Sequence, residues 1–130
     1  MKILLDTHVL IWALEDSPRL PLKIRDAILD ENNQIYVSTL SLWEIAIKHK
    51  KMPESMPYSA TQIRDFAMRA GYIFLSLNLD AITIFDQNDL SEHKDPFDQL
   101  LVCQSASHNM RLFTHDEKLK QYNVGFVELF

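Results

Sequence analysis

Short apolar segments alternate along the chain with longer segments of mixed polarity. The apolar, β-rich runs are four or five residues long and lie at Lys2–Leu5, Gln34–Ser38, Tyr72–Leu75, Arg111–Thr114 and Val124–Val127. Runs this short and this apolar are typical of strands buried on both faces of a sheet. The pattern therefore predicts a strand at each of these runs.

The segments between these runs have helical spacing and helix-capping residues. We expect helices to begin near Thr7 or His8 and to cover Leu20–Leu29, Leu40 to about Lys48, the residues between Ser59 and Gly71, Leu79–Phe85, and Asp95 to about Asn109. Ser59 forms a capping box with Gln62, Asn78 is a candidate cap, and Asp95 opens the last of these helices. Strands that alternate with helices predict an α/β fold, a three-layer α/β/α sandwich with a mainly parallel sheet.

Composition narrows the possible functions. The 130 residues fit a single domain, which we expect to span residues 1–130, and the two glycines exclude glycine-rich phosphate loops. The lone Cys103 excludes an internal disulfide and a cysteine-rich zinc site. A net charge of −5 argues against broad electrostatic adhesion to nucleic acid. Asp6 and His8 interrupt the apolar N-terminus and no stretch is long enough to cross a bilayer, so we expect a soluble cytoplasmic protein.

Two acidic residues directly follow predicted strands. Asp6 comes after the first strand, and Asp116 comes after the strand at Arg111–Thr114. Parallel α/β sheets place their chemistry beyond the carboxyl ends of the strands, which makes both residues candidates for a site. Each also has a purely structural interpretation, Asp6 as a helix cap and Asp116 as a turn residue or a cap before residues 117–121.

Glu44 lies on a face of its predicted helix that should pack on the sheet. It shares this stripe with Leu40, Trp43 and Ile47. A buried carboxylate needs a cation, a metal ion or a proton, because burying it unpaired is costly. The alternative is an ion pair with Lys48, one turn further along the helix.

Asp98 also shares a helix stripe with small and apolar residues, which are Leu101, Val102 and Ser105. Its structural interpretation is strong, because a first-turn acid interacts favourably with the positive end of a helix. However, Asp95 already suffices as the cap of this helix.

Together these residues place two acids at strand ends and two on apolar helix faces. Carboxylates crowded in this way repel one another unless a cation neutralises them. Oxygen ligands favour Mg²⁺ or Mn²⁺, and such ions serve phosphoryl chemistry by activating water and stabilising the leaving oxygen. The residues therefore indicate a divalent-metal site suited to phosphoryl chemistry, with Asp6, Glu44, Asp98 and Asp116 as candidate catalytic and metal-binding residues.

The sequence resembles the PIN domain family, and within it the small VapC-type ribonuclease toxins of prokaryotic toxin–antitoxin pairs. The matching segments are Leu4–Trp12 (LLDTHVLIW), Ser38–Lys48 (STLSLWEIAIK), His93–Leu101 (HKDPFDQLL) and Phe113–Asp116 (FTHD). The resemblance implies that the same four acids hold Mg²⁺ or Mn²⁺, with support from Thr7, Asp95 and Thr114. Gln99 departs from the pattern, because it stands where the subgroup usually has arginine.

The resemblance also implies partners: an RNA substrate, a cognate antitoxin protein and a second copy of the chain. Exposure of Trp12, Phe66 or Phe85 would support such a homodimer. The basic run Lys48–Lys51 either guides a phosphate backbone to the site or is simply a solvated helix end. The main alternative function is a catalytically idle PIN-like module that binds RNA or a partner protein. A receiver-type signalling domain fits less well, because only Asp6 matches its acidic pattern.

Overall fold

One parallel sheet forms the centre of the molecule. The computed structural model describes residues 1–89, 95–116 and 126–129. Within them the strands pair in the order β3–β2–β1–β4–β5, and every pair is parallel. The strands are β1 (Lys2–Leu5), β2 (Gln34–Ser38), β3 (Ile73–Leu75), β4 (Arg111–Thr114) and β5 (Phe126–Leu129).

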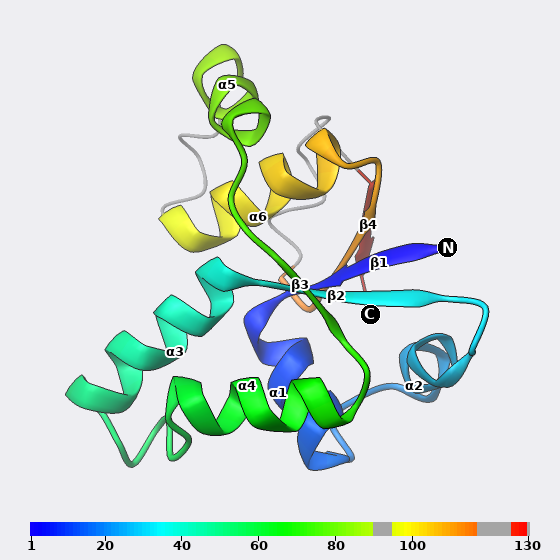
Figure 1. Cartoon of the computed structure of the whole chain (residues 1–130), viewed down its shortest axis with the longest axis vertical. Helices are drawn as coiled ribbons and strands as arrows, with labels where there is room; N and C mark the ends of the chain where they lie inside the picture. The colour runs from blue at the N-terminus through cyan, green and yellow to red at the C-terminus, as the bar shows by residue number, and fades with distance from the viewer. Residues whose placement is uncertain (90–94, 117–125, 130) are drawn as a thin grey trace.

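Helices cover both faces of the sheet (Figure 1). They are α1 (Thr7–Glu15), α2 (Leu22–Leu29), α3 (Thr39–Lys51), α4 (Ala60–Arg69), α5 (Leu79–Gln87) and α6 (Pro96–Ser107). The first four lie on one side of the sheet, below it in Figure 1, and α5 and α6 lie on the other. This arrangement confirms the predicted α/β/α sandwich.

The alternation of side chains along the strands produces the two cores. Ile3 and Leu5 of β1 face the layer of α1 to α4, whereas Leu4 faces α5 and α6. All three residues are completely buried, because β1 is the middle strand and is covered on both faces. The adjacent residues Leu112 and Phe113 of β4 divide between the two cores in the same way. Burial on both faces explains why these strands have almost no polar positions.

The strand order creates a switch point between β1 and β4. The chain moves from β1 to β2 and β3 on one side, then returns to β4 and β5 on the other. In parallel α/β sheets, sites lie beyond the carboxyl ends of the strands at such a switch point. Asp6 and Asp116 are the acids that follow these two strands.

The strand predictions hold with small shifts. The bounds of β1, β2 and β4 are as predicted, and β3 begins one residue later than predicted, at Ile73. The last strand was predicted at Val124–Val127, but β5 runs from Phe126 to Leu129, and residues 124 and 125 lie outside the described residues. The helix considered for residues 117–121 also lies outside them.

Several helix predictions need correction. Helix α2 begins at Leu22 and not at Leu20, because Pro21 is its N-cap, and α5 continues past Phe85 to Gln87. Helix α3 continues through its basic residues to Lys51, since cations are favourable at a helix C-terminus. Asn78 does precede α5, but its side chain caps nothing; its Oδ1 instead accepts a hydrogen bond from the Ser107 hydroxyl at 3.2 Å. The capping box of Ser59 and Gln62 is present, and Gly71 follows its helix with φ of 81°. None of the described helices is long and apolar enough to cross a membrane.

The single cysteine provides a test of the packing of α6. Cys103 is completely buried, and burial raises the pKa of its thiol to about 11. Because the thiolate is the reactive form, we expect no reaction with Ellman's reagent in the native protein near neutral pH and complete reaction in concentrated guanidinium chloride. Rapid labelling of the native protein would contradict the packing of α6 on the sheet.

Candidate active site at the carboxyl ends of β1 and β4

Asp6 is a buried carboxylate at the end of the central strand. Its side chain is 4% exposed, and its backbone N–H donates to the Phe113 carbonyl of β4 at 3.0 Å. Oδ1 accepts from the backbone N–H of Val9 at 2.8 Å, so Asp6 is also the N-cap of α1. The prediction that Asp6 caps a helix is therefore confirmed, and the capping carboxylate lies at the switch point between β1 and β4.

The other oxygen of Asp6 joins the two neighbouring strands. The Thr114 hydroxyl donates to Oδ2 at 2.6 Å, and the backbone N–H of His115 approaches it at 3.4 Å. The same Thr114 hydroxyl accepts from the backbone N–H of Asp116 at 3.1 Å. Thr114 thus fixes both the Asp6 carboxylate and the turn that carries Asp116.

Burial dominates the ionisation of Asp6. Desolvation raises the pKa of its carboxyl above the usual value, while the hydrogen bonds from Thr114 and Val9 and the nearby charge of His8 lower it. The net direction is upward, which means that the charged form is disfavoured at this position. A cation next to Asp6 would remove this penalty.

Glu44 is the second buried carboxylate, and it has two close partners. Its side chain is 4% exposed, and Oε1 accepts from the Thr7 hydroxyl at 2.7 Å. Oε2 contacts the Lys48 ammonium at 2.6 Å, so the alternative of an ion pair within α3 is confirmed together with the burial. Because Thr7 follows Asp6 directly, this hydrogen bond places Glu44 beside the ends of β1 and β4.

The predicted packing stripe of Glu44 is partly wrong. Trp43 is 60% exposed, and the buried residues of α3 are Leu40, Ser41, Glu44 and Ile45. The buried face is therefore rotated toward Ser41 and Ile45. Trp43 instead packs edge-on against Phe97 of α6, with ring centroids 5.6 Å apart.

Asp95 and Asp98 lie where α6 begins. Asp95 is the N-cap, and its Oδ1 accepts from the backbone N–H of Phe97 at 2.9 Å. Asp98 lies in the first turn and is half-buried, above the buried residues Leu101, Val102 and Ser105. The contact of Phe97 with Trp43 brings this end of α6 to α3, the helix that carries Glu44.

Sequence patterns did not reveal an aromatic cluster beside Asp6. Trp12 of α1 contacts His115 edge-on at 5.0 Å and His8 at 6.1 Å between ring centroids. Trp12 is buried, whereas both histidines are exposed. The only sequence signal for this cluster was that His8 follows Thr7 and His115 follows Thr114, two residues named as supporting the site. Residues so far apart in the chain share no periodicity that would reveal their contact.

The donor chemistry partly fits a divalent cation. Asp6 offers buried carboxylate oxygens, which are suitable ligands for a divalent cation. Among the described residues, no ion pair involves Asp6. Glu44 already has a cation, the ammonium of Lys48. In the described part of the chain, no three His, Cys, Asp or Glu side chains are grouped so that they could hold an ion together. The prediction that all four acids are ligands thus stays a prediction.

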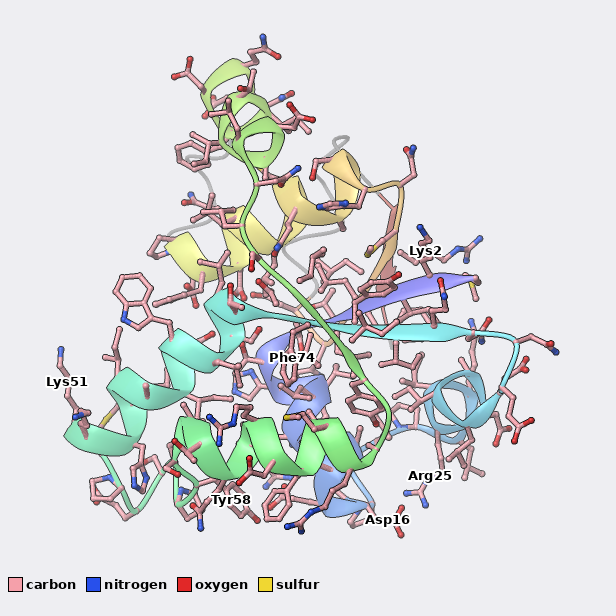
Figure 2. The ribbon with its side chains drawn as sticks, viewed as in Figure 1. Lys2, Asp16, Arg25, Lys51, Tyr58 and Phe74 are labelled. Carbon is pink, nitrogen blue, oxygen red and sulfur yellow. The ribbon has the colours of Figure 1, made fainter. Side chains whose placement is uncertain are left out.

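In the basic run Lys48–Lys51 of α3, the first two side chains make contacts within the protein and the last two are exposed to solvent. Lys48 contacts Glu44, and the His49 ring contacts the Met56 carbonyl at 2.8 Å. Lys50 and Lys51 are exposed, and Lys51 lies at the far end of the helix (Figure 2).

Both the sequence and the fold are similar to those of known proteins. The family model for the PIN domain matches residues 3–125. The fold is similar to that of VapBC2 from Rickettsia felis, in a crystal structure bound to a promoter DNA fragment, with a TM-score of 0.75, 16% identity and coverage of 100% of this chain and 99% of that one. It is also similar to DNA-bound VapBC from Salmonella typhimurium, with a TM-score of 0.73, 18% identity and coverage of 98% and 97%. A third similar structure is VapBC-5 from Mycobacterium tuberculosis, described as a member of the VapBC family of toxin-antitoxin systems, with a TM-score of 0.57, 16% identity and coverage of 98% and 96%. No curated protein matches the sequence.

The hydrogen bond between Thr7 and Glu44 provides a stability test. Thr7→Val keeps the shape of the side chain but leaves a buried carboxylate oxygen without its donor, so the free energy of unfolding should fall by about 1–3 kcal/mol. Thr61→Val is the matched control on an exposed position of α4, where the change should be within about 0.5 kcal/mol. Urea unfolding measures both, and equal losses in the two variants would contradict the assigned hydrogen bond.

Proposed function

The chain belongs to the PIN domain family, and from this premise we propose that it is a metal-dependent endoribonuclease, the toxin of a toxin–antitoxin pair. We place this activity in a single domain that spans residues 1–130 and acts in the cytoplasm. The observation that carries the proposal is the buried Asp6 carboxylate at the switch point, hydrogen-bonded to Thr114 across two strands. PIN domains are in general nucleases that depend on divalent metal ions.

We assign the metal ion to the side of the site that contains Asp6. Asp6 is the central candidate ligand, and Asp98 and Asp116 are the further acids that we assign to the ion, the first in the opening turn of α6 and the second after β4. Glu44 borders the same site through Thr7. Mg²⁺ or Mn²⁺ fits an all-oxygen set of this kind. When bound, such an ion supplies a polarised water and stabilises charge on the phosphate oxygens.

The protein itself fixes the acids before any substrate arrives. Thr114 and the N-terminus of α1 hold the two oxygens of Asp6, and Thr7 holds Glu44. Carboxylates held by buried hydrogen bonds cannot rotate freely, so a site of this kind needs little reorganisation during the reaction. The exposed rings of His8 and His115 border it on the solvent side.

The proposal that RNA is the substrate rests on the resemblance to VapC-type toxins. Two features of the chain agree with an RNA substrate that is single-stranded or looped. The net charge of −5 provides little general attraction for a duplex backbone. The exposed Trp43 offers an aromatic surface to unstacked bases, which are accessible in single-stranded or looped RNA.

Exposed apolar side chains support protein partners. Leu29 of α2 is 70% exposed and Phe66 of α4 is 39% exposed, and both line a cavity of about 480 Å³ between α1, α2 and α4. Leu79 and Phe85 of α5 are also exposed, at 76% and 40%. We propose that these two surfaces are where the antitoxin and a second copy of the chain bind. Trp12, which is buried, contributes to neither.

The alternative is a catalytically idle module that binds RNA or a partner protein. The ion pair of Glu44 with Lys48 favours this alternative, because it occupies one of the four acids. Metal binding without RNA turnover would identify such a module, so binding and cleavage must be measured separately.

Metal binding should stabilise the protein through Asp6. At a Mn²⁺ concentration about a hundred times Kd, the Tm should rise by roughly 5–10 °C. Asp6→Asn should abolish the rise, whereas Asp26→Asn, on an exposed position of α2, should preserve it. Thermal unfolding with Mn²⁺ and with EDTA makes the measurement, and an unchanged rise in Asp6→Asn would remove Asp6 from the metal site.

Cleavage of a pool of structured RNAs tests the activity itself. We expect cleavage with Mn²⁺ or Mg²⁺, none with EDTA, and a loss of about a hundredfold or more in Asp98→Asn, because a ligand contribution of several kcal/mol is removed. Asp80→Asn is the matched control, since Asp80 is an exposed first-turn acid of α5. If metal binds and no RNA in the pool is cut, the idle module becomes the better description.

A further inference from the structure

The two buried carboxylates of the site have different kinds of partners. The described hydrogen-bond partners of Asp6 are neutral, a hydroxyl group and backbone N–H groups, although the charge of His8 is also near. Glu44 has one neutral partner, Thr7, and one charged partner, the ammonium of Lys48. The two carboxylates are therefore neutralised differently, although both lie beside the ends of β1 and β4.

The contact between Lys48 and Glu44 is more than a surface ion pair. The nitrogen lies 2.6 Å from Oε2, at the short end of the range for charge-assisted hydrogen bonds, and the Glu44 side chain is only 4% exposed. An ordinary pair of this spacing on an exposed helix is weak and easily broken. Here the carboxylate has little access to bulk water, so losing the ammonium would leave a buried charge without its cation.

A divalent ion cannot easily share this oxygen with the ammonium. Ions such as Mg²⁺ bind carboxylate oxygens at about 2.0–2.1 Å, so an ion on Oε2 would lie within a few ångströms of the Lys48 nitrogen. Two cations at that separation in a poorly solvated site repel each other strongly. The other oxygen, Oε1, is held by the Thr7 hydroxyl at 2.7 Å.

We propose that the Lys48 ammonium is the resident cation of Glu44 and takes the place of a second divalent ion. The inference rests on the proposed metal-dependent function and refines it: the chain binds one ion, on the side of Asp6, and Lys48 supplies the other positive charge. The side chain of Lys48 is 36% exposed, so its charge remains accessible to a phosphate group that enters the site. Lys48 is thus a positioning residue for Glu44 and a fixed counter-charge to the substrate.

The number of bound Mn²⁺ ions per chain tests this inference. Isothermal titration calorimetry of the full chain should give one ion for the wild type and two for Lys48→Met, whose unbranched side chain keeps the stem but removes the charge. Lys51→Met is the matched control, because it removes the same charge from the exposed far end of α3 and should still bind one ion (Figure 2). Lys48→Arg restores a cation and should also bind one ion.

The outcomes separate this inference from the proposed function. Equal numbers of ions in the wild type and in Lys48→Met would overturn the inference and leave the metal-dependent function standing. Binding of no ion by the wild type or any variant would overturn both. Circular dichroism verifies that Lys48→Met is folded; if it is not, Lys48→Gln, whose amide can still donate to Glu44, replaces it with the same expected gain of one ion.

Discussion

The hydrogen bond from Thr114 to Asp6 is the contact on which the geometry of the site depends. It joins residues 108 positions apart at a separation of 2.6 Å, and it does so where β1 and β4 end side by side. Parallel pairing of these strands brings the two residues together, and the return of the chain to the other face of the sheet leaves the space beyond them open. The position of Thr7, and through it of Glu44, follows from where β1 stops. The sheet topology therefore positions Asp6 directly and Glu44 through its hydrogen bond to Thr7.

This arrangement has an energetic cost that packing alone does not explain. An apolar residue in place of Asp6 or Glu44 could be buried without the cost of desolvating a charge. Such a residue would also match the neighbouring strands, which are continuous apolar runs. The structure offsets the cost in two ways, with neutral donors at Asp6 and with a donor and a cation at Glu44. Retaining two buried acids at the switch point is the pattern of a site whose chemistry needs negative charge.

Much of the fold was predictable because its signals are local. Buried parallel strands are nearly all apolar, so Lys2–Leu5, Gln34–Ser38 and Arg111–Thr114 could be delimited from composition alone. Capping is also local, and the box formed by Ser59 and Gln62 appears as expected. The errors arise where distant residues compete. Asn78 bonds to Ser107 instead of capping α5, and the exposed face of α3 that carries Trp43 is set by α6. For the same reason the sequence suggested the acids but not the Thr7–Glu44 bond between them.

Charge places a last constraint on how a substrate reaches such a site. The chain has a net charge of −5, and one of its lysines, Lys48, is engaged by a buried glutamate. Non-specific binding of nucleic acids depends on free Lys and Arg side chains that contact phosphates, so this protein has little affinity to offer a backbone in general. Under the proposed function, affinity would have to come from the site itself, through a bound cation, the Lys48 ammonium and the exposed rings of His8, His115 and Trp43. A small site that supplied most of the binding energy would favour a flexible strand, which can enter it, over a rigid duplex, and this agrees with the proposed cleavage of single-stranded or looped RNA.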